Sequence, residues 1–199
     1  MNWDNQSNLS VKNMKIILAS KSPRRKELLE AYGVNIEIIP SDADEDIKEN
    51  NPSELVKKLS DIKASSVYQS VKNQMDDALV LGADTVVYAE GKILGKPSDR
   101  EDAYKMIKTI SGNVHSVFTG FTIIYPDGRK ITDYSETKVY VYDMSDEQIN
   151  TYIDTPEPYD KAGGYGIQGL FGKYVEKIDG DYNNVVGLPV SKIFHVLGM

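Results

Sequence analysis

The period of the hydrophobic positions changes several times along the chain, and this alternation predicts a mixed α/β fold. Residues 14–19 and 34–40 are short apolar runs with the length of buried strands. Between them, Ser22 and Pro23 are suited to the start of a helix, because a proline in the first turn needs no N–H partner. Gly33 provides a C-terminal stop. The first forty residues therefore predict a strand, a helix and a second strand.

A long helix and a long strand follow, and each carries a charged residue among its apolar positions. The helix begins at Ser53, and Lys63 lies on its hydrophobic stripe. The apolar run 78–89 contains Asp84 where a buried strand usually has a hydrocarbon side chain. These two charged positions are the first sign of chemistry in the chain.

The second half of the chain predicts a hairpin between further helices. Residues 98–101 match a capping box for a helix that reaches about Ile110. Alternating runs at 114–125 and 130–142 are joined by a Pro-Asp-Gly turn, which is typical of a hairpin. Another capping box begins at Ser145.

The ends and the last connection complete the predicted organisation. Residues 156–172 are rich in glycine and proline and predict a loop, and residues 189–197 predict a closing helix. Residues 1–13 have no periodic pattern and predict a flexible extension. The remaining 14–199 are expected to form a single domain, or two tightly joined lobes.

Composition narrows the class of protein. Hydrophobic residues make up 40% and charged residues 27%, as in folded soluble proteins. The net charge of −7 opposes binding to long nucleic acids, although a local basic cluster can still bind a nucleotide. Because no run approaches the roughly 18 apolar residues of a membrane span and no leader opens the chain, we expect a cytoplasmic protein without a membrane partner. The lack of cysteine excludes thiolate chemistry, and the two histidines are expected to be packed or surface residues.

The connection from the first strand to the first helix has the features of a phosphate site. Around Ser20, Arg24 and Arg25, backbone N–H groups, the positive end of the helix dipole and two guanidiniums converge. Adjacent helical residues differ by about 100° around the axis, so one arginine can grip a phosphate while the other orients a different group. A capped surface helix with solvated charges is the alternative.

Two lysines and two carboxylates are further candidates. Lys96 is presented between a glycine and a proline on a short connection, although an ordinary turn lysine also fits. Lys63 either extends along the helix edge or points at a bound phosphate. Asp84 is the strongest catalytic candidate, because a buried carboxylate is costly unless something compensates it; a side-chain cap is its alternative. The acidic run 42–46, which includes Glu45, is either solvated or supplies a second carboxylate for a divalent ion.

Residues 164–169 match the pattern G-x-G-x-x-G, but they do not predict a dinucleotide site. The pattern neither follows a strand nor opens a helix, as a dinucleotide fingerprint must. A pliable loop that packs on a flat or polar group remains, with Gln168 able to donate to and accept from a base edge.

Five motifs taken together resemble the Maf family. In family order they are LASKSPRRKELL at 18–29, GADTVV at 82–87, LGKP at 94–97, KAGGYGIQG at 161–169 and VVGLP at 185–189. The resemblance implies a fold similar to that of inosine triphosphate pyrophosphatases, with an elongated mixed sheet, flanking helices and a cleft between two lobes. It also implies hydrolysis of a nucleoside triphosphate between its α- and β-phosphates, which yields a nucleoside monophosphate and pyrophosphate.

The resemblance assigns roles to individual positions. Asp84 would be the proton acceptor, and together with Glu45 it would help to hold Mg²⁺ or Mn²⁺. The positions that match base-selecting residues of the dTTP/UTP-preferring branch are Arg24, Thr85 and Gln168. Other positions that would line the pocket or clamp phosphates are Ser20, Arg25, Lys63 and Lys96, of which Lys96 is expected to be catalytic.

Other functions remain open from the sequence. One is a nucleotide-binding regulator of septum formation, the effect for which the family was named, acting through a protein partner. Another is a pyrophosphatase that prefers 7-methyl-GTP, although Thr85 and the loop around Gln168 favour dTTP, UTP or modified pyrimidine triphosphates. Lys138 stands where the family usually has a glutamate, so the contact of that acid is not carried over. Assembly as a homodimer is left open.

Overall fold

A seven-stranded mixed sheet runs through the computed structural model, which describes residues 15–75 and 77–199. The strands are β1 (Lys15–Leu18), β2 (Asn35–Ile38), β3 (Leu79–Ala89), β4 (Lys92–Leu94), β5 (Val114–Ile124), β6 (Lys130–Val141) and β7 (Val175–Asp179). Their order is β2-β1-β3-β5-β6-β7, with β4 paired to β3. The strands β2, β1 and β3 run parallel, and the remaining pairs are antiparallel. The predicted mixed α/β architecture is confirmed.

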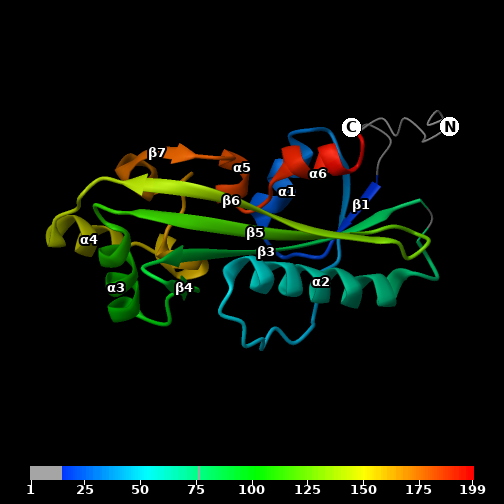
Figure 1. The fold of residues 1–199 in the computed structure, drawn as a ribbon, viewed down its shortest axis with the longest axis horizontal. Helices are drawn as coiled ribbons and strands as arrows, with labels where there is room; N and C mark the ends of the chain where they lie inside the picture. The colour runs from blue at the N-terminus through cyan, green and yellow to red at the C-terminus, as the bar shows by residue number, and fades with distance from the viewer. Residues whose placement is uncertain (1–14, 76) are drawn as a thin grey trace.

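Helices cover both faces of this sheet (Figure 1). They are α1 (Pro23–Glu30), α2 (Pro52–Val71), α3 (Arg100–Ile110), α4 (Asp146–Ile153), α5 (Tyr182–Val186) and α6 (Val190–Val196), with 3₁₀ turns η2 (Glu157–Asp160), η3 (Ala162–Gly164) and η4 (Leu170–Tyr174). The long helix α2 lies along one face, and α1, α5 and α6 lie on the other. Within the described ranges, no helix has both the length and the apolar character needed to cross a bilayer.

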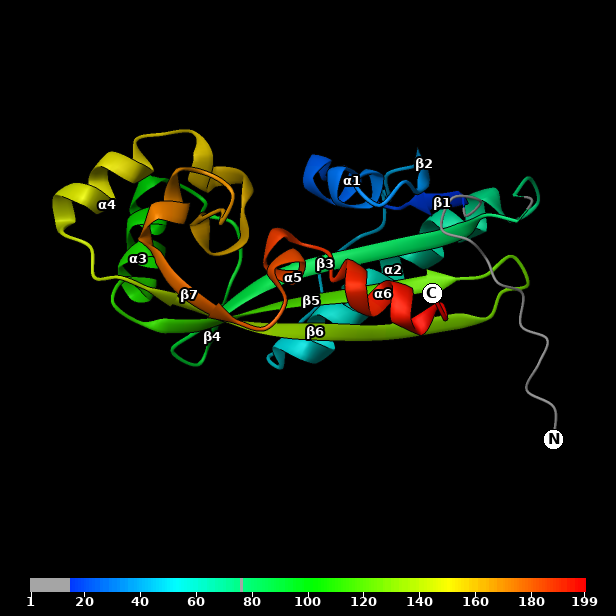
Figure 2. The same cartoon turned by 90° about the horizontal axis from the view of Figure 1, so that it is seen from above.

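The hydrophobic core is divided along the length of the sheet. One cluster joins α1 and α6 to the strands β1, β3 and β5, and it includes Leu29, Phe121 and Ile193. Another joins α3, α4 and the η segments to the opposite end of β3, β5 and β6, around Ile107 and Phe171. Figure 2 shows these two groups of elements at opposite ends of the sheet, with β3, β5 and β6 running through both.

One edge of β3 changes partner halfway along its length. Leu79–Leu81 pair with the parallel strand β1, whereas Val87–Ala89 pair with the antiparallel strand β4. Within the described chain, residues 82–86 have no strand partner on that edge, and β5 pairs with the other edge throughout. A ligand site is expected at such a break, because the strand exposes main-chain groups where its neighbours diverge.

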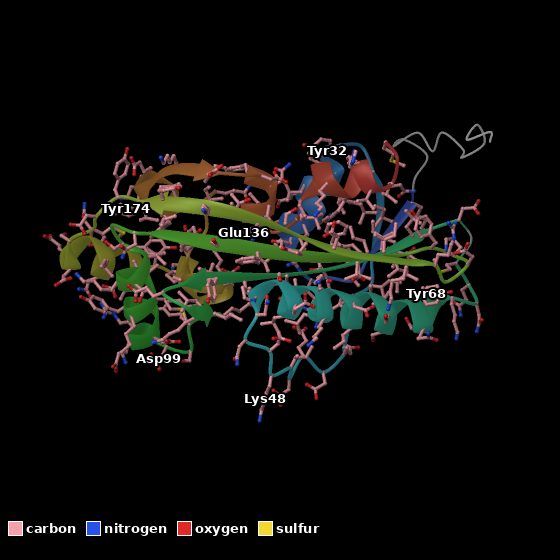
Figure 3. All side chains as sticks on the ribbon, in the orientation of Figure 1. Tyr32, Lys48, Tyr68, Asp99, Glu136 and Tyr174 are labelled. Carbon is pink, nitrogen blue, oxygen red and sulfur yellow. The ribbon has the colours of Figure 1, made fainter. Side chains whose placement is uncertain are left out.

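The local capping differs from the sequence prediction in two places. The helix α2 begins at Pro52, and the side chain of Asn51 accepts from the N–H of Ser53, which was predicted to open this helix. In α3 the cap is Asp99 (Figure 3), whose carboxylate accepts from the N–H of Asp102 at 2.8 Å. In both cases another residue type favoured at helix N-caps, one or two positions away from the predicted serine, makes the cap.

Three further predictions have different outcomes. The predicted capping box at Ser145 is confirmed, with the Gln148 side chain completing it. The predicted loop 156–172 contains three short 3₁₀ turns, because its glycines and prolines allow tight turns without long helices. The predicted extension 1–13 lies outside the described residues.

Two glycines allow α2 to pack unusually close to the sheet. A Cβ atom at Gly82 in β3 would overlap the backbone around Ser60 and Ala64, and one at Gly120 in β5 would overlap the backbone of Val56. Glycine is therefore required at both positions by the close approach of the helix backbone. This packing fixes how far side chains from α2 reach past the sheet.

We expect Gly120→Ala to lower the free energy of unfolding by about 1–3 kcal/mol, because the added methyl group forces the backbone of α2 away from β5. Denaturant unfolding measures this loss. The matched control is Gly95→Ala, where nothing lies within 4 Å of the added Cβ. Equal stability of the two variants would contradict the close-packing argument.

Candidate active site

A cavity of about 610 Å³ lies beside the unpaired stretch of β3. Its walls come from the β1–α1 connection, the acidic segment before α2, the Gly95–Lys96 connection, the glycine-rich segment after η2 and the end of α5. The site residues predicted from the sequence all line it: Ser20, Arg24, Arg25, Glu45, Lys63, Asp84, Thr85, Lys96 and Gln168. Segments distant in sequence thus meet at one place, and the roles of these residues remain predictions.

The β1–α1 connection forms one wall through Ser20. The hydroxyl oxygen of Ser20 accepts from the N–H of Ser22 at 3.2 Å and from Arg25 Nη1 at 3.1 Å. Ser22 precedes α1 without making a side-chain cap, and Pro23 has no N–H to satisfy. The positive end of the α1 dipole therefore faces the cavity without a carboxylate or hydroxyl cap.

The two arginines differ in how many donors they have left for a ligand. Arg25 is buried, and it donates through Nε to Gly187 O at 2.8 Å, through Nη1 to Ser20 and through Nη2 to Thr85 Oγ1 at 3.1 Å. Arg24 is half-buried and makes a single hydrogen bond within the described chain, from Nη1 to Asp160 Oδ2 at 3.1 Å. A guanidinium has five N–H donors, so most of those on Arg24 remain available.

The guanidinium of Arg25 is buried in the wall of the cavity, and its positive charge acts on the cavity from there. Burial lowers the pKa of its guanidinium from the ordinary value, while the negative charge of Asp84 acts in the opposite direction. Gly187 presents its carbonyl to this guanidinium from a backbone conformation with φ of 128°, which favours glycine. The expected division of labour between adjacent arginines is consistent with this difference in environment.

Asp84 and Glu45 share one cation. Lys63 Nζ lies 2.6 Å from Asp84 Oδ1 and 2.9 Å from Glu45 Oε2. The side chains of Lys63 and Asp84 are only 13% and 14% exposed, so each compensates the burial of the other. Lys63 therefore does not run along the helix edge, as one of its two interpretations expected; it reaches past β3 to the cavity.

The donor chemistry around Lys63 also fits a divalent cation. Two carboxylates converge on one position that already holds a positive charge. Mg²⁺ is usually held by one or two carboxylates together with oxygens from substrate phosphates and water. In the described part of the chain, no three His, Asp or Glu side chains form a metal-binding group, so the protein alone offers an incomplete ligand set. All four acids of the run are exposed to solvent, and the Glu45 side chain is 49% exposed, but only Glu45 pairs with Lys63.

The opposite wall joins Lys96 to the glycine-rich segment. Gly163 N donates to Gly95 O at 2.8 Å, and both Gly163 and Gly164 have positive φ values near 70°. A Cβ at Gly163 would overlap the side chain of Val87 in β3. The segment is therefore held close to the strand, and within the described residues Lys96 keeps its ammonium without a protein partner.

A family model described as "Maf-like protein" matches residues 15–199. The chain belongs to this family. A curated relative from Thermoanaerobacter sp. (strain X514), named dTTP/UTP pyrophosphatase, is 52% identical over 92% of this chain and 95% of its own length. A second protein of that name, from Thermosipho africanus (strain TCF52B), is 51% identical over 92% of each chain. The family resemblance found in the sequence is confirmed.

Solved structures show a more distant likeness. The crystal structure of a nucleoside-triphosphatase / dITP/XTP pyrophosphatase from Mycobacterium abscessus aligns over 93% of this chain and 94% of its own, with a TM-score of 0.44 and 13% identity. The Staphylococcus aureus Ham1 protein aligns over 64% of this chain at the same TM-score. Likeness at this level bears on neither substrate nor mechanism.

Sequence reasoning on this Maf-like protein missed Asp160 and Lys161. Both line the cavity, and Lys161 Nζ lies 2.6 Å from Asp160 Oδ1. Burial raises the pKa of Asp160, but hydrogen bonds from Lys161 and Arg24 outweigh this and hold it below the ordinary value. The only sequence signal was that Lys161 opens the motif at 161–169 and Asp160 directly precedes it, since an adjacent acid and base are common on surfaces.

A buried polar chain beneath the cavity was also missed. Thr85 Oγ1 lies 2.9 Å from Thr119 Oγ1, which donates to Asn184 O at 3.0 Å. Asn184 Nδ2 donates to Val117 O and to Thr137 Oγ1, both at 3.0 Å. Asparagine is common in turns, but Asn184 is fully buried in α5 and ties this helix to β5 and β6.

The departure from the family pattern at Lys138 lies away from the cavity. Lys138 is on β6, exposed to solvent, opposite Ser116 of β5 and Asp179 of β7. It does not line the cavity. The missing glutamate therefore removes no cavity-lining group from this structure.

A buried histidine supports the glycine-rich segment. His115 Nε2 lies 2.7 Å from the hydroxyl of Tyr165, which stands between Gly164 and Gly166 on the cavity wall. Burial lowers the pKa of His115 to about 4 and raises the pKa of Tyr165 above its usual range. Both groups are therefore neutral at pH 7, and His115 is a packed residue, as expected.

This histidine makes stability depend on pH in a defined window. Below its ordinary pKa of about 6.5, the unfolded chain binds a proton that the folded chain accepts only near pH 4. Stability is therefore complete above pH 6.5 and falls as the pH decreases toward 4. We expect a loss of about 2 kcal/mol between pH 7.5 and pH 5 from this residue.

Denaturant unfolding of His115→Gln at the two pH values tests the assignment, because the variant should lose that part of the pH dependence. The matched control is His195→Gln, since His195 is exposed. If His115→Gln keeps the pH dependence of the unsubstituted protein, the burial argument is wrong.

Proposed function

We propose that this Maf-like protein hydrolyses dTTP and UTP to the nucleoside monophosphate and pyrophosphate. The observation that carries the proposal is the meeting of Asp84 with Lys63, Arg24 and Lys96 around one cavity beside the break in β3. The names of the relatives, which are about 50% identical over 92% of the chain, support the same substrates.

Asp84 is the proposed proton acceptor. Lys63 binds its Oδ1, and within the described residues Oδ2 has no protein partner, so this oxygen can accept a proton from water. The water oxygen then forms a bond to the α-phosphorus while the bond to the β-phosphate oxygen breaks. Pyrophosphate leaves with the electron pair of that bond, and the water proton stays on Asp84 until product release.

The cations of the cavity oppose the charge that develops on the phosphates. Lys63 has three N–H donors; one donates to Asp84, and the ammonium also pairs with Glu45, so it keeps capacity to donate to a phosphate oxygen. Lys96 contributes an ammonium that pairs with no other described residue, from the opposite wall, and Arg25 contributes a fixed positive charge from within the protein. Such preorganised charges stabilise a transition state more than they stabilise the bound substrate.

A divalent cation completes the proposed site. Asp84 and Glu45 would hold Mg²⁺ or Mn²⁺ together with phosphate oxygens. When bound, such an ion supplies Lewis-acid stabilisation of phosphate charge. The proposed setting is the cytoplasm, and a homodimer remains a prediction that a solution mass measurement decides.

The substitution Asp84→Asn should lower kcat by about 10²- to 10⁴-fold, because it removes the proton acceptor while keeping the shape of the side chain. Release of pyrophosphate from dTTP measures the rate, and calorimetry should show that nucleotide binding is retained. The control Asp61→Asn changes a half-buried carboxylate on α2 that pairs with Lys130, outside the cavity. Turnover by Asp84→Asn at the unsubstituted rate would remove Asp84 from the mechanism.

The same assay separates the proposed activity from its alternatives. Hydrolysis of 7-methyl-GTP in preference to dTTP and UTP would show that the site prefers a 7-methylguanine base to a pyrimidine. Binding of nucleotides without release of pyrophosphate from any of them would favour a regulator that acts through a protein partner.

Removal of metal with a chelator tests whether the reaction requires a divalent cation. We expect chelation to reduce pyrophosphate release to background and added Mg²⁺ or Mn²⁺ to restore it. Glu45→Gln should raise the metal concentration needed for half-maximal activity by about tenfold, because one anionic ligand is lost. Full activity in chelator would show that Lys63 and the arginines suffice.

A further inference from the structure

Arg24 and Asp160 connect the two sides of the cavity mouth. Arg24 is on α1, and Asp160 ends η2, 136 positions later in the chain. Among the described residues, their contact is the only hydrogen bond or ion pair that joins α1 to the segment 157–174. Figure 2 shows α1 and this segment on either side of the middle of the sheet.

This contact contributes little to stability. The side chains of Arg24 and Asp160 are 28% and 61% exposed, and an ion pair with such access to water adds little to stability. Its effect is instead to fix the position of the Arg24 side chain. Asp160 uses Oδ2 for Arg24, while Oδ1 accepts from Lys161, whose side chain is only 16% exposed. The carboxylate is thus held from the loop side and gives the guanidinium a fixed anchor.

The anchored guanidinium retains donors that face a ligand. Asp160 occupies Nη1, and no described residue accepts from Nε or Nη2 of Arg24. The neighbouring Arg25 is less available to a ligand, because it is buried and each of its three nitrogens already donates to a protein acceptor. Arginine has no acceptor, so the ligand group opposite Arg24 must supply oxygen or nitrogen lone pairs.

Pyrimidine bases differ in this property at N3 and at the C4 substituent, and the C4 substituent is the group that an arginine at the edge of the base would meet in the proposed pose. Thymine carries a carbonyl oxygen at C4, an acceptor, whereas cytosine carries an amino group there, a donor. An arginine that is fixed in orientation attracts the first and repels the second. An arginine that swings freely can turn instead to a phosphate or to water, and it then discriminates less.

We propose that Asp160 is a specificity-determining positioning residue, which anchors Arg24 so that its remaining N–H groups select pyrimidines with a C4 carbonyl over those with a C4 amino group. The inference rests on the proposed function for the identity of the substrate. It adds a residue that does not touch the reacting atoms and acts through Arg24.

The test compares kcat/KM for dTTP and dCTP in Asp160→Ala and Asp160→Asn. We expect the dTTP-to-dCTP ratio to fall about tenfold in Asp160→Ala, through a higher KM for dTTP with kcat little changed. Asp160→Asn keeps an acceptor for Nη1 but loses the charge, so its ratio should fall less. This order would not result from a general loss of structure, which lowers both values together.

The matched control is Asp154→Ala. Asp154 is 60% exposed and pairs with Arg100 Nε at 2.8 Å, so it resembles Asp160 in exposure and pairing but lies outside the cavity. Its dTTP-to-dCTP ratio should equal that of the unsubstituted protein. An unchanged ratio in both Asp160 variants, or equal losses for dTTP and dCTP, would overturn the proposal.

Binding measurements distinguish this proposal from the activity on which it rests. If the unsubstituted protein releases no pyrophosphate, the proposed function fails, and the ratio of dissociation constants for dTTP and dCTP then decides the role of Asp160. A tenfold smaller ratio in Asp160→Ala supports the role, whereas an unchanged ratio, or no binding of either nucleotide, refutes it. Should Asp160→Ala fail to fold, Asp160→Asn carries the same comparison.

Discussion

The shared ammonium of Lys63 is the interaction on which the cavity depends. Two carboxylates, Asp84 and Glu45, face the same volume, and like charges in a partly dry site repel each other strongly unless a cation lies between them. Lys63 reaches that position because Gly82 and Gly120 let the backbone of α2 approach β3 and β5. A packing constraint on one face of the sheet thus sets the electrostatics at the edge of a strand.

The cavity also separates fixed charges from available ones. Arg25 and Lys63 make most of their hydrogen bonds to the protein, and these bonds hold them in place before any ligand arrives. Arg24, Lys96 and Gln168 keep donors without protein partners in the described chain. Arg25 and Lys63 therefore contribute preorganised positive charge, and the other three side chains contribute donors that can bind a ligand. Ligand binding need not displace the groups that surround Asp84.

Much of the fold could be predicted from the sequence, because strands and helices leave periodic patterns and the hairpin at 126–128 has a strong turn signal. Most of the predicted residues that line the cavity lie within motifs of the family, whereas Glu45 and Lys63 lie outside the five motifs. Contacts between distant segments could not be predicted. The pairing of Arg24 with Asp160 spans 136 positions, and the burial of Asn184 depends on Thr119 and Thr137 from two other strands. Composition makes each of these look like an ordinary surface or turn residue, and only the fold brings their partners together.

The break in β3 gives the cavity a component that is independent of side-chain identity. Between the stretch that pairs with β1 and the stretch that pairs with β4, residues 82–86 lack a strand partner on one edge within the described chain, and Asp84, Thr85 and Val86 line the cavity there. Amide and carbonyl groups at this edge survive every substitution except proline. Substitutions around the cavity can therefore change which ligand binds, while the backbone groups at this edge stay in place. The ability to bind a ligand and the specificity for a particular ligand then depend on different parts of the site.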